Sequence, residues 1–335
     1  MSLRASALRA FGVEIGDVAV EADGDGRLLS VRSIEARGRW GSAAASGTAT
    51  LDEGGGAGRL EALDLDVRGR RGALRAPLAF EWTRAEFSWA DLDLAALGGT
   101  IRGRGRLGKS VDVVLKAEGV AVDDATEGVD ARVEATGAAE RPSLSVEVGA
   151  RRLGWGERGG PARLRAVQDD AGLRVEELQV AVRGLGAVEG RLTLPFSIGL
   201  SGVTRVEGAP LRGALQGSLA PEAFPDLPVG FSSLAFSVDA RDDALSGSVR
   251  CAGLAIRDVP GGVLRVDGET VVEIASGKEG TTATVRAGDG RPFQAAGTLR
   301  TPVGWDASRP ERLASAASDA AIEGSLRGGA ADLSP

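Results

Sequence analysis

The sequence contains no histidine and no tyrosine, and its only cysteine is Cys251. Without histidine, the chain lacks the commonest general base and the commonest protein metal ligand. A single cysteine excludes an intrachain disulfide and any metal site that needs several thiolates, so we interpret Cys251 as a small buried residue. We therefore predict no catalytic residue, no metal site and no cofactor, and we expect a protein that is not an enzyme.

Aromatic residues are also scarce, at 4% of the chain, although 43% of the residues are hydrophobic. Large cores normally use aromatic rings to fill their volume, and this chain relies mostly on Ala, Val and Leu instead. At 335 residues it also exceeds the roughly 250–300 residues at which a single core stops growing. We therefore expect the chain to divide, or to extend in one dimension as repeat proteins do.

Blocks of one charge and long apolar runs are missing as well. The net charge is −7, and 40 basic residues are interleaved with 47 acidic ones, so nucleic acid is not an expected partner. No apolar stretch approaches the roughly 20 residues of a membrane span, and the first eleven residues lack the apolar core of a signal peptide. On its own, this chain is expected to carry neither a signal nor a transmembrane segment.

The dominant positive feature is a short run in which every second residue is apolar. Leu63, Leu65 and Val67, for example, alternate with Asp64 and Asp66. Side chains on a strand alternate between its two faces, so each run predicts a half-buried strand. Glycine and aspartate clusters separate the runs at intervals suited to hairpins, which predicts about 25 strands. The expected fold is all-β: an elongated, coiled antiparallel sheet, similar to a solenoid, whose apolar faces line one lengthwise groove.

The same punctuation suggests three regions. Residues 1–29 are expected to be an N-terminal entry segment, and residues 30–305 a repetitive β-groove region with a proline-rich interruption near 219–228. Residues 306–335 are rich in Ala, Ser and Gly and form either a tail or a truncated further repeat; residues 321–328 follow the strand pattern seen upstream. Only residues 5–11 and 310–322 show short helical periodicity.

Two motifs resemble catalytic or ligand-binding sequences. Residues 103–110, Gly-Arg-Gly-Arg-Leu-Gly-Lys-Ser, match the pattern of a phosphate-binding loop, in which Lys109 would reach the phosphates. That loop needs a helix after it, whereas the valine-rich alternation from Val111 predicts a strand, so a glycine-rich hairpin turn is favoured. Acidic pairs at 123–124, 169–170 and 242–243 and the run at 23–26 are interpreted as solvated turn residues.

Trp82, Phe87 and Trp89 form a local aromatic cluster. Two interpretations remain open. The rings pack locally under a loop, or they stand at the mouth of an apolar groove, where amphipathic rings meet lipid head groups.

Several phrases of the sequence resemble a known family. Residues 134–148 resemble the phrase "strand, Gly-Thr-Leu, x-x-Pro-x-Leu, strand" of TamB and AsmA-like proteins, and residues 98–107 running into 111–122 do so as well. Residues 178–194 and 211–219 are similar. The resemblance implies a β-taco, an elongated U-shaped sheet with an apolar inner groove. It also implies a fragment of a longer periplasmic protein that is anchored in the inner membrane and associated with phospholipid transport and outer-membrane protein assembly.

Together these observations predict a lipid-binding and transport module, or a scaffold module, of a cell-envelope protein. Its implied partners are phospholipid acyl chains, an outer-membrane barrel protein, and the inner membrane through an anchor outside this chain. The alternative is a structural or adhesive β-solenoid with a closed core and no ligand. The residues expected to line the groove are the inward members of four strands: Leu63, Leu65, Val67, Val111, Val113, Leu115, Val180, Val182, Leu192 and Leu194.

Overall fold

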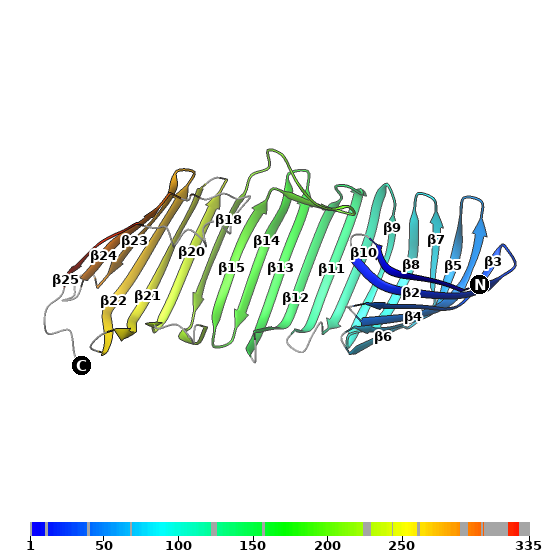
Figure 1. Cartoon of the computed structure of the whole chain (residues 1–335), viewed down its shortest axis with the longest axis horizontal. Coiled ribbons are helices and arrows are strands. Elements are labelled where there is room, and N and C mark those ends of the chain that lie inside the picture. Colours follow the sequence, from blue (N-terminus) through cyan, green and yellow to red (C-terminus); the bar gives the residue numbers. More distant parts are fainter. Residues whose placement is uncertain are drawn as a thin grey trace. The chain divides into compact units, whose positions relative to one another are not determined.

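The computed structural model describes residues 2–10, 13–38, 41–67, 69–121, 126–155, 158–223, 229–242, 244–259, 262–288, 294–302, 304 and 321–327. Within these residues the chain is all-β, and its one helical element is a 3-10 turn, η1, at Pro221–Ala223. Of its 25 strands, 23 belong to one long sheet, and two form a separate hairpin. The strand pairs are antiparallel, so the predicted fold class is confirmed (Figure 1).

Contacts between residues divide the chain into two units, and the boundary falls within the strand β14 (Gly172–Val182). Unit 1 comprises residues 1–175 and 195–208, and unit 2 comprises residues 176–194 and 209–335. Besides the first part of β14, the strands of unit 1 are β1 (Ser2–Ala10), β2 (Val13–Gly24), β3 (Leu28–Gly38), β4 (Gly41–Asp52), β5 (Gly55–Val67), β6 (Arg70–Leu74), β7 (Leu78–Thr83), β8 (Phe87–Ala96), β9 (Gly99–Leu107), β10 (Ser110–Val120), β11 (Glu127–Ala138), β12 (Ser143–Trp155), β13 (Arg158–Asp169), β16 (Phe196–Gly199) and β17 (Gly202–Arg205). Besides the rest of β14, those of unit 2 are β15 (Gly186–Leu194), β18 (Arg212–Leu219), β19 (Val229–Gly230), β20 (Ser233–Arg241), β21 (Ala244–Val259), β22 (Gly262–Gly277), β23 (Gly280–Ala287), β24 (Gln294–Thr301) and β25 (Ala321–Arg327).

Unit 1 is a meander in which each strand pairs with the next one along the chain, with one interruption. The first half of β5 pairs with β7, its last four residues pair with β6, and both β6 and β7 pair with β8. Together β6 and β7 therefore occupy one strand position, broken at residues 75–77. Pro77 lies in this break, and proline cannot donate the backbone hydrogen bond that a continuous inner strand requires.

Unit 2 is also a meander: β15 pairs with β18, β18 pairs with β20, and from β20 to β25 each strand pairs with the next. The two-residue strand β19 pairs with β21. The strand predicted at 321–328 is present as β25 (Ala321–Arg327), which pairs with β24. Of the proline-rich interruption, Pro221–Ala223 forms η1, and residues 224–228 lie outside the described residues. Residues 5–10, considered above for a short helix, belong to β1, and residues 310–320 are not among those described.

Alternation along each strand separates an apolar face from a charged one. On β10, Val111 and Val113 are 4% and 8% exposed, whereas Lys116 and Glu118 on the opposite side are exposed. Cross-strand partners share a face, so the register carries this apolar side across the sheet. Val113 lies opposite Gly105 on β9 and Ala135 on β11. We call this side of unit 1 its apolar face.

Glycines on the apolar face lie opposite large side chains, which extend across them. The indole of Trp89 occupies the space that a Cβ at Gly105 would need, and the ring of Phe80 does the same at Gly58. In unit 2, Leu192 covers Gly213. A glycine in a strand is destabilising by itself, but an aromatic neighbour that covers its backbone compensates for this. The large residues therefore lie flat along the sheet.

Filling one of these glycine positions should destabilise the sheet. We expect Gly105→Val to lower the free energy of unfolding by about 1–3 kcal/mol, because the new methyl groups displace the Trp89 indole from its place. Urea denaturation followed by circular dichroism would measure the change. The matched control is Gly149→Ala on β12, since a Cβ there has open space around it. Equal midpoints for the Gly105→Val variant and the unchanged protein would contradict the covering role of Trp89.

Candidate ligand-binding face

Six of the ten predicted lining residues share the apolar face of unit 1. Leu63, Leu65 and Val67 come from β5, and Val111, Val113 and Leu115 come from β10. The register connects the two sets in steps. Leu65 lies opposite Gly72, which lies opposite Ala96 on β8. Leu92, on the same side of β8, lies opposite Gly103, which in turn lies opposite Leu115.

The other four predicted residues lie in unit 2. Val180 and Val182 are half-buried at alternate positions of β14, between the exposed side chains of Gln179, Ala181 and Arg183. Leu192 and Leu194 are half-buried on β15, and Leu192 pairs with Gly213. The structure therefore places the predicted lining residues in two sets, one in each unit.

A cluster of four aromatic rings forms part of the apolar face of unit 1. Phe80 stacks on Trp82 with ring centroids 5.7 Å apart, and Phe87 lies 5.9 Å from both Phe80 and Trp89. The rings pack on one another, yet Phe87 stays 43% exposed. Phe80 was not among the predicted aromatic residues, although Leu78, Phe80 and Trp82 follow the period of two that is typical of a strand.

Gln168 is a buried polar residue on this face, and sequence reasoning missed it. It lies on β13 opposite Leu144, which lies opposite Ala135, so it belongs to the same cross-strand row as Val113. Its side chain is 1% exposed and forms hydrogen bonds with Ile198 of the β16–β17 hairpin. Its position in the alternation could have identified it: Leu164 and Ala166 point to the apolar face, and Gln168 is the next residue in that series.

The segment that matches a phosphate-binding loop is a tight β-hairpin. Gly103 and Gly105 lie within β9, and Ser110 begins β10, with the Gly108 N–H donating to the carbonyl of Ser110 at 3.0 Å. Gly103 and Gly105 of the motif face inward, where Leu115 and Trp89 lie across them, and Gly108 lies in the turn. The spacing of the two inward glycines therefore follows from packing on the apolar face, and the segment lacks the loop-to-helix geometry that cradles a phosphate.

Two of the predicted acidic turn residues, Asp25 and Asp169, bind the backbone of their own turns. Asp25 accepts hydrogen bonds from the backbone N–H groups of Leu28 and Arg27, and these bonds lower the pKa of its carboxyl, with the bond from Leu28 contributing most. Asp169 accepts from Ala171 at 2.8 Å. Residues 123–124 and Asp243 lie outside the described residues. Asp25 and Asp169 therefore stabilise turns, as the sequence predicted, whereas Asp23 lies within β2 and pairs with Arg32.

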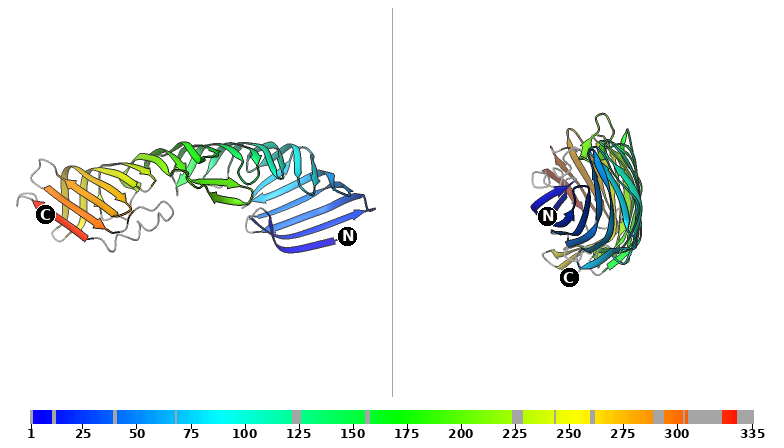
Figure 2. Two further views of the ribbon diagram at one scale, coloured as in Figure 1. Left: turned by 90° about the horizontal axis from the view of Figure 1, so that it is seen from above. Right: turned by 90° about the vertical axis from the view of Figure 1, so that its right-hand side faces the viewer.

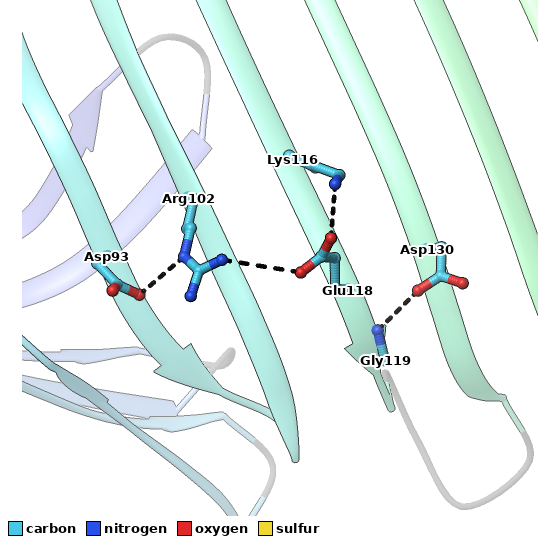
Figure 3. A network of polar contacts seen from close by, with 6 residues as sticks. All are labelled: Asp93, Arg102, Lys116, Glu118, Gly119 and Asp130. Carbon is cyan, nitrogen blue, oxygen red and sulfur yellow. Dashed lines mark hydrogen bonds and ion pairs between the residues drawn. The ribbon is translucent and has the colours of Figure 1, made fainter.

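The opposite face of unit 1 carries cross-strand ion pairs. Arg102 on β9 lies 3.5 Å from the carboxylate of Asp93 and 3.9 Å from that of Glu118, and the Lys116 ammonium lies 2.6 Å from Glu118 (Figure 3). The hydrogen bond from Lys116 is the main cause of a lowered pKa at Glu118. Arg102, Lys116 and Glu118 are exposed and Asp93 is half-buried. Water screens the exposed charges, so the pairs keep this face solvated and contribute little to stability.

An open hollow of about 800 Å³ lies beside strands β3 to β9 of unit 1. Its charged lining residues are Glu35, Arg37, Asp64, Asp66, Arg71 and Arg75. Among the ten predicted lining residues, Leu65 is the one that borders it. Because charged side chains of both signs surround this hollow, it does not correspond to the apolar lining that the sequence predicted.

Comparisons with known proteins returned no match: no family model, no curated protein and no solved structure corresponds to this chain. Among the described residues, no group of three or more acidic or cysteine side chains is placed to hold a metal ion. The described part of the chain also has no helical segment with the length and hydropathy that a membrane crossing requires.

Cys251 provides a direct test of burial on the apolar side of unit 2. It lies on β21 opposite Leu234 and Thr270, it is 7% exposed, and burial raises the pKa of its thiol. We expect iodoacetamide at pH 8 to label it more slowly in the folded chain than in urea, as measured by mass spectrometry. Because the folded chain holds the thiol proton more tightly than the unfolded chain, the protonated thiol favours folding below the ordinary thiol pKa of about 8.5. This contribution to stability is lost as the pH rises through the raised pKa of the folded state. Equal labelling rates would contradict the burial.

Proposed function

We propose that this chain is a lipid-handling module whose apolar sheet face holds acyl chains for transfer between membranes or during outer-membrane protein assembly. The observation that carries the proposal is the apolar face of unit 1. Six predicted lining residues and four aromatic rings share that face. The main contacts between the described strands of unit 1 join ladder neighbours in the sheet, and the short β16–β17 hairpin lies on the apolar side.

Exposure along the apolar face is uneven: Phe87 is 43% exposed, whereas Val111 and Val113 are 4% and 8% exposed. Sheets with one apolar side ordinarily bury it against another layer, because a large exposed apolar surface promotes aggregation. A ligand that covers this face as it forms would satisfy the same requirement.

The side-chain packing on the apolar face suits the binding of an acyl chain. Large side chains lie over inward glycines of neighbouring strands, as Trp89 does over Gly105 and Phe80 over Gly58, so apolar atoms cover the backbone there. Covering each methylene of an acyl chain is worth about 0.8 kcal/mol, which is close to what a bilayer already provides. Such a face would lower the barrier to transfer without driving it, so net flow would need another source of free energy.

The setting of this module is part of the proposal. The strand phrases resemble those of TamB and AsmA-like proteins, and an all-β meander is the fold that this resemblance implies. We propose accordingly that the chain works in the periplasm, as part of a protein anchored in the inner membrane. Phospholipid acyl chains are its proposed ligands, and an outer-membrane barrel protein is a proposed partner.

A charge placed on the apolar face tests the function. We expect Leu115→Asp to weaken binding of dansyl-labelled undecanoic acid at least tenfold, because the carboxylate loses its hydration when an acyl chain covers it. A fluorescence titration of delipidated protein would measure the dissociation constant. The matched control is Val114→Asp, the neighbouring residue on the charged face, which lies opposite Arg104 and Glu134.

The result separates this function from that of a structural sheet. Binding that is lost in Leu115→Asp and kept in Val114→Asp supports the proposal. Failure of the unchanged protein to bind the probe, together with the absence of co-purifying phospholipid in mass spectra, would favour a structural or adhesive role without a ligand.

A further inference from the structure

The β16–β17 hairpin stands apart from the long sheet. Its four cross-strand pairs, from Phe196 with Arg205 to Gly199 with Gly202, form a two-stranded sheet of their own. Within unit 1 the hairpin projects from the side of the sheet toward which β2 to β4 also turn, and it is seen in green below the ribbon on the left of Figure 2. This is the side of Gln168, and therefore the apolar face.

One side chain provides most of the polar contact between the hairpin and the sheet. The Gln168 amide donates to the carbonyl of Ile198 at 2.9 Å and accepts from its backbone N–H at 2.6 Å, so it pairs with Ile198 much as a neighbouring strand would. The same amide also donates to the carbonyl of Pro142 at 2.8 Å. A second contact joins the Leu200 N–H to the carbonyl of Ala139 at 2.9 Å.

The remaining contact is less favourable. Ile198 and Val203 are cross-strand partners, yet they are 39% and 66% exposed. Ser197 is 1% exposed, and among the described residues its hydroxyl finds no hydrogen-bond partner. A buried, unpaired hydroxyl offsets part of the gain from the Gln168 bonds. Pro195 at the base of the hairpin is buried, and Phe196 and Leu200 are half-buried, so limited apolar burial adds to the few hydrogen bonds that hold the hairpin on the face.

Detachment of the hairpin would leave the strand ladder of the sheet intact, because the chain enters and leaves the hairpin at two residues that are hydrogen-bonded to each other. The Val206 N–H donates to the carbonyl of Pro195 at 2.9 Å, so the two ends of the hairpin meet. The strands on either side of it in the sequence, β15 and β18, pair directly with each other from Gly186–Leu219 to Thr193–Arg212. None of these ladder bonds depends on the hairpin.

We propose that the β16–β17 hairpin is a displaceable cover for the apolar face of unit 1, and that acyl ligands compete with it for the rows around Gln168. The inference rests on the proposed function and describes its regulation. A ligand that binds only the uncovered state shifts the equilibrium toward that state by its differential affinity. In the absence of ligand, the docked hairpin shields part of a face that would otherwise promote aggregation.

The test compares locked, unchanged and excised hairpins, with dansyl-labelled undecanoic acid as the probe. The locked form carries Ala139→Cys and Leu200→Cys in a Cys251→Ser background, since a backbone hydrogen bond of 2.9 Å joins these two residues. The excised form joins Pro195 to Val206 through two glycines. We expect the oxidised lock to weaken binding at least tenfold, a reductant to restore it, and the excised form to bind several-fold tighter than the unchanged chain.

A point variant provides a second, independent measurement. Gln168→Leu removes the polar contact and keeps the face apolar, so it should tighten binding as excision does. Its matched control is Gln179→Leu, an exposed position on β14, which should bind as the unchanged chain does. Equal affinity of the oxidised lock, the reduced lock and the excised chain overturns the cover and leaves the lipid-binding proposal standing. Failure of every form to bind the probe, the excised chain included, overturns both.

Discussion

The pairing of a large side chain with an inward glycine on the neighbouring strand is the constraint on which this sheet depends. A single sheet has no facing layer to bury its side chains, so it must cover its own backbone. Trp89 over Gly105 and Phe80 over Gly58 do this in unit 1, and Leu192 over Gly213 does it in unit 2. The pairing explains how a chain with 50 glycines and few aromatic residues maintains long continuous strands. It also covers the backbone with apolar atoms on the face on which the proposed function rests.

The two faces meet different requirements. The apolar side excludes water by the flat packing of its own residues, whereas the charged side carries ion pairs between neighbouring strands, such as Arg102 with Asp93 and Glu118. Charges directly opposite one another also disfavour a slipped register, because a shift of one residue would place them on the apolar side. Register and solubility therefore depend on the same side chains.

The strand pattern and the separation of the faces could be predicted from the sequence, because a period of two in hydrophobicity is a local signal. Leu63, Leu65 and Val67, for example, are half-buried on one side of β5, as expected. The phosphate-loop resemblance was also resolved correctly, because the valine-rich run after Ser110 indicated a strand.

The missed features depend on contacts between residues that are distant in the sequence. No local pattern shows that Gly105 lies beneath Trp89, 16 residues earlier, or that Gln168 meets Ile198, 30 residues later. The break at residues 75–77 was missed for a different reason: two short strands in one sheet position have the same alternation as two consecutive hairpin strands. The division of the lining residues between two units also became visible only when contacts were considered.

The closed base at Pro195 and Val206 has a consequence for how such a chain can change. Because the two residues are hydrogen-bonded, the length of chain between them is independent of the β15–β18 ladder. Insertions, deletions or replacements in this hairpin can therefore accumulate in evolution without changing the pairing register of β15 and β18. The tip at Leu200 and Ser201 is correspondingly a natural graft site, where an engineered epitope or a small folded domain would leave the ladder intact.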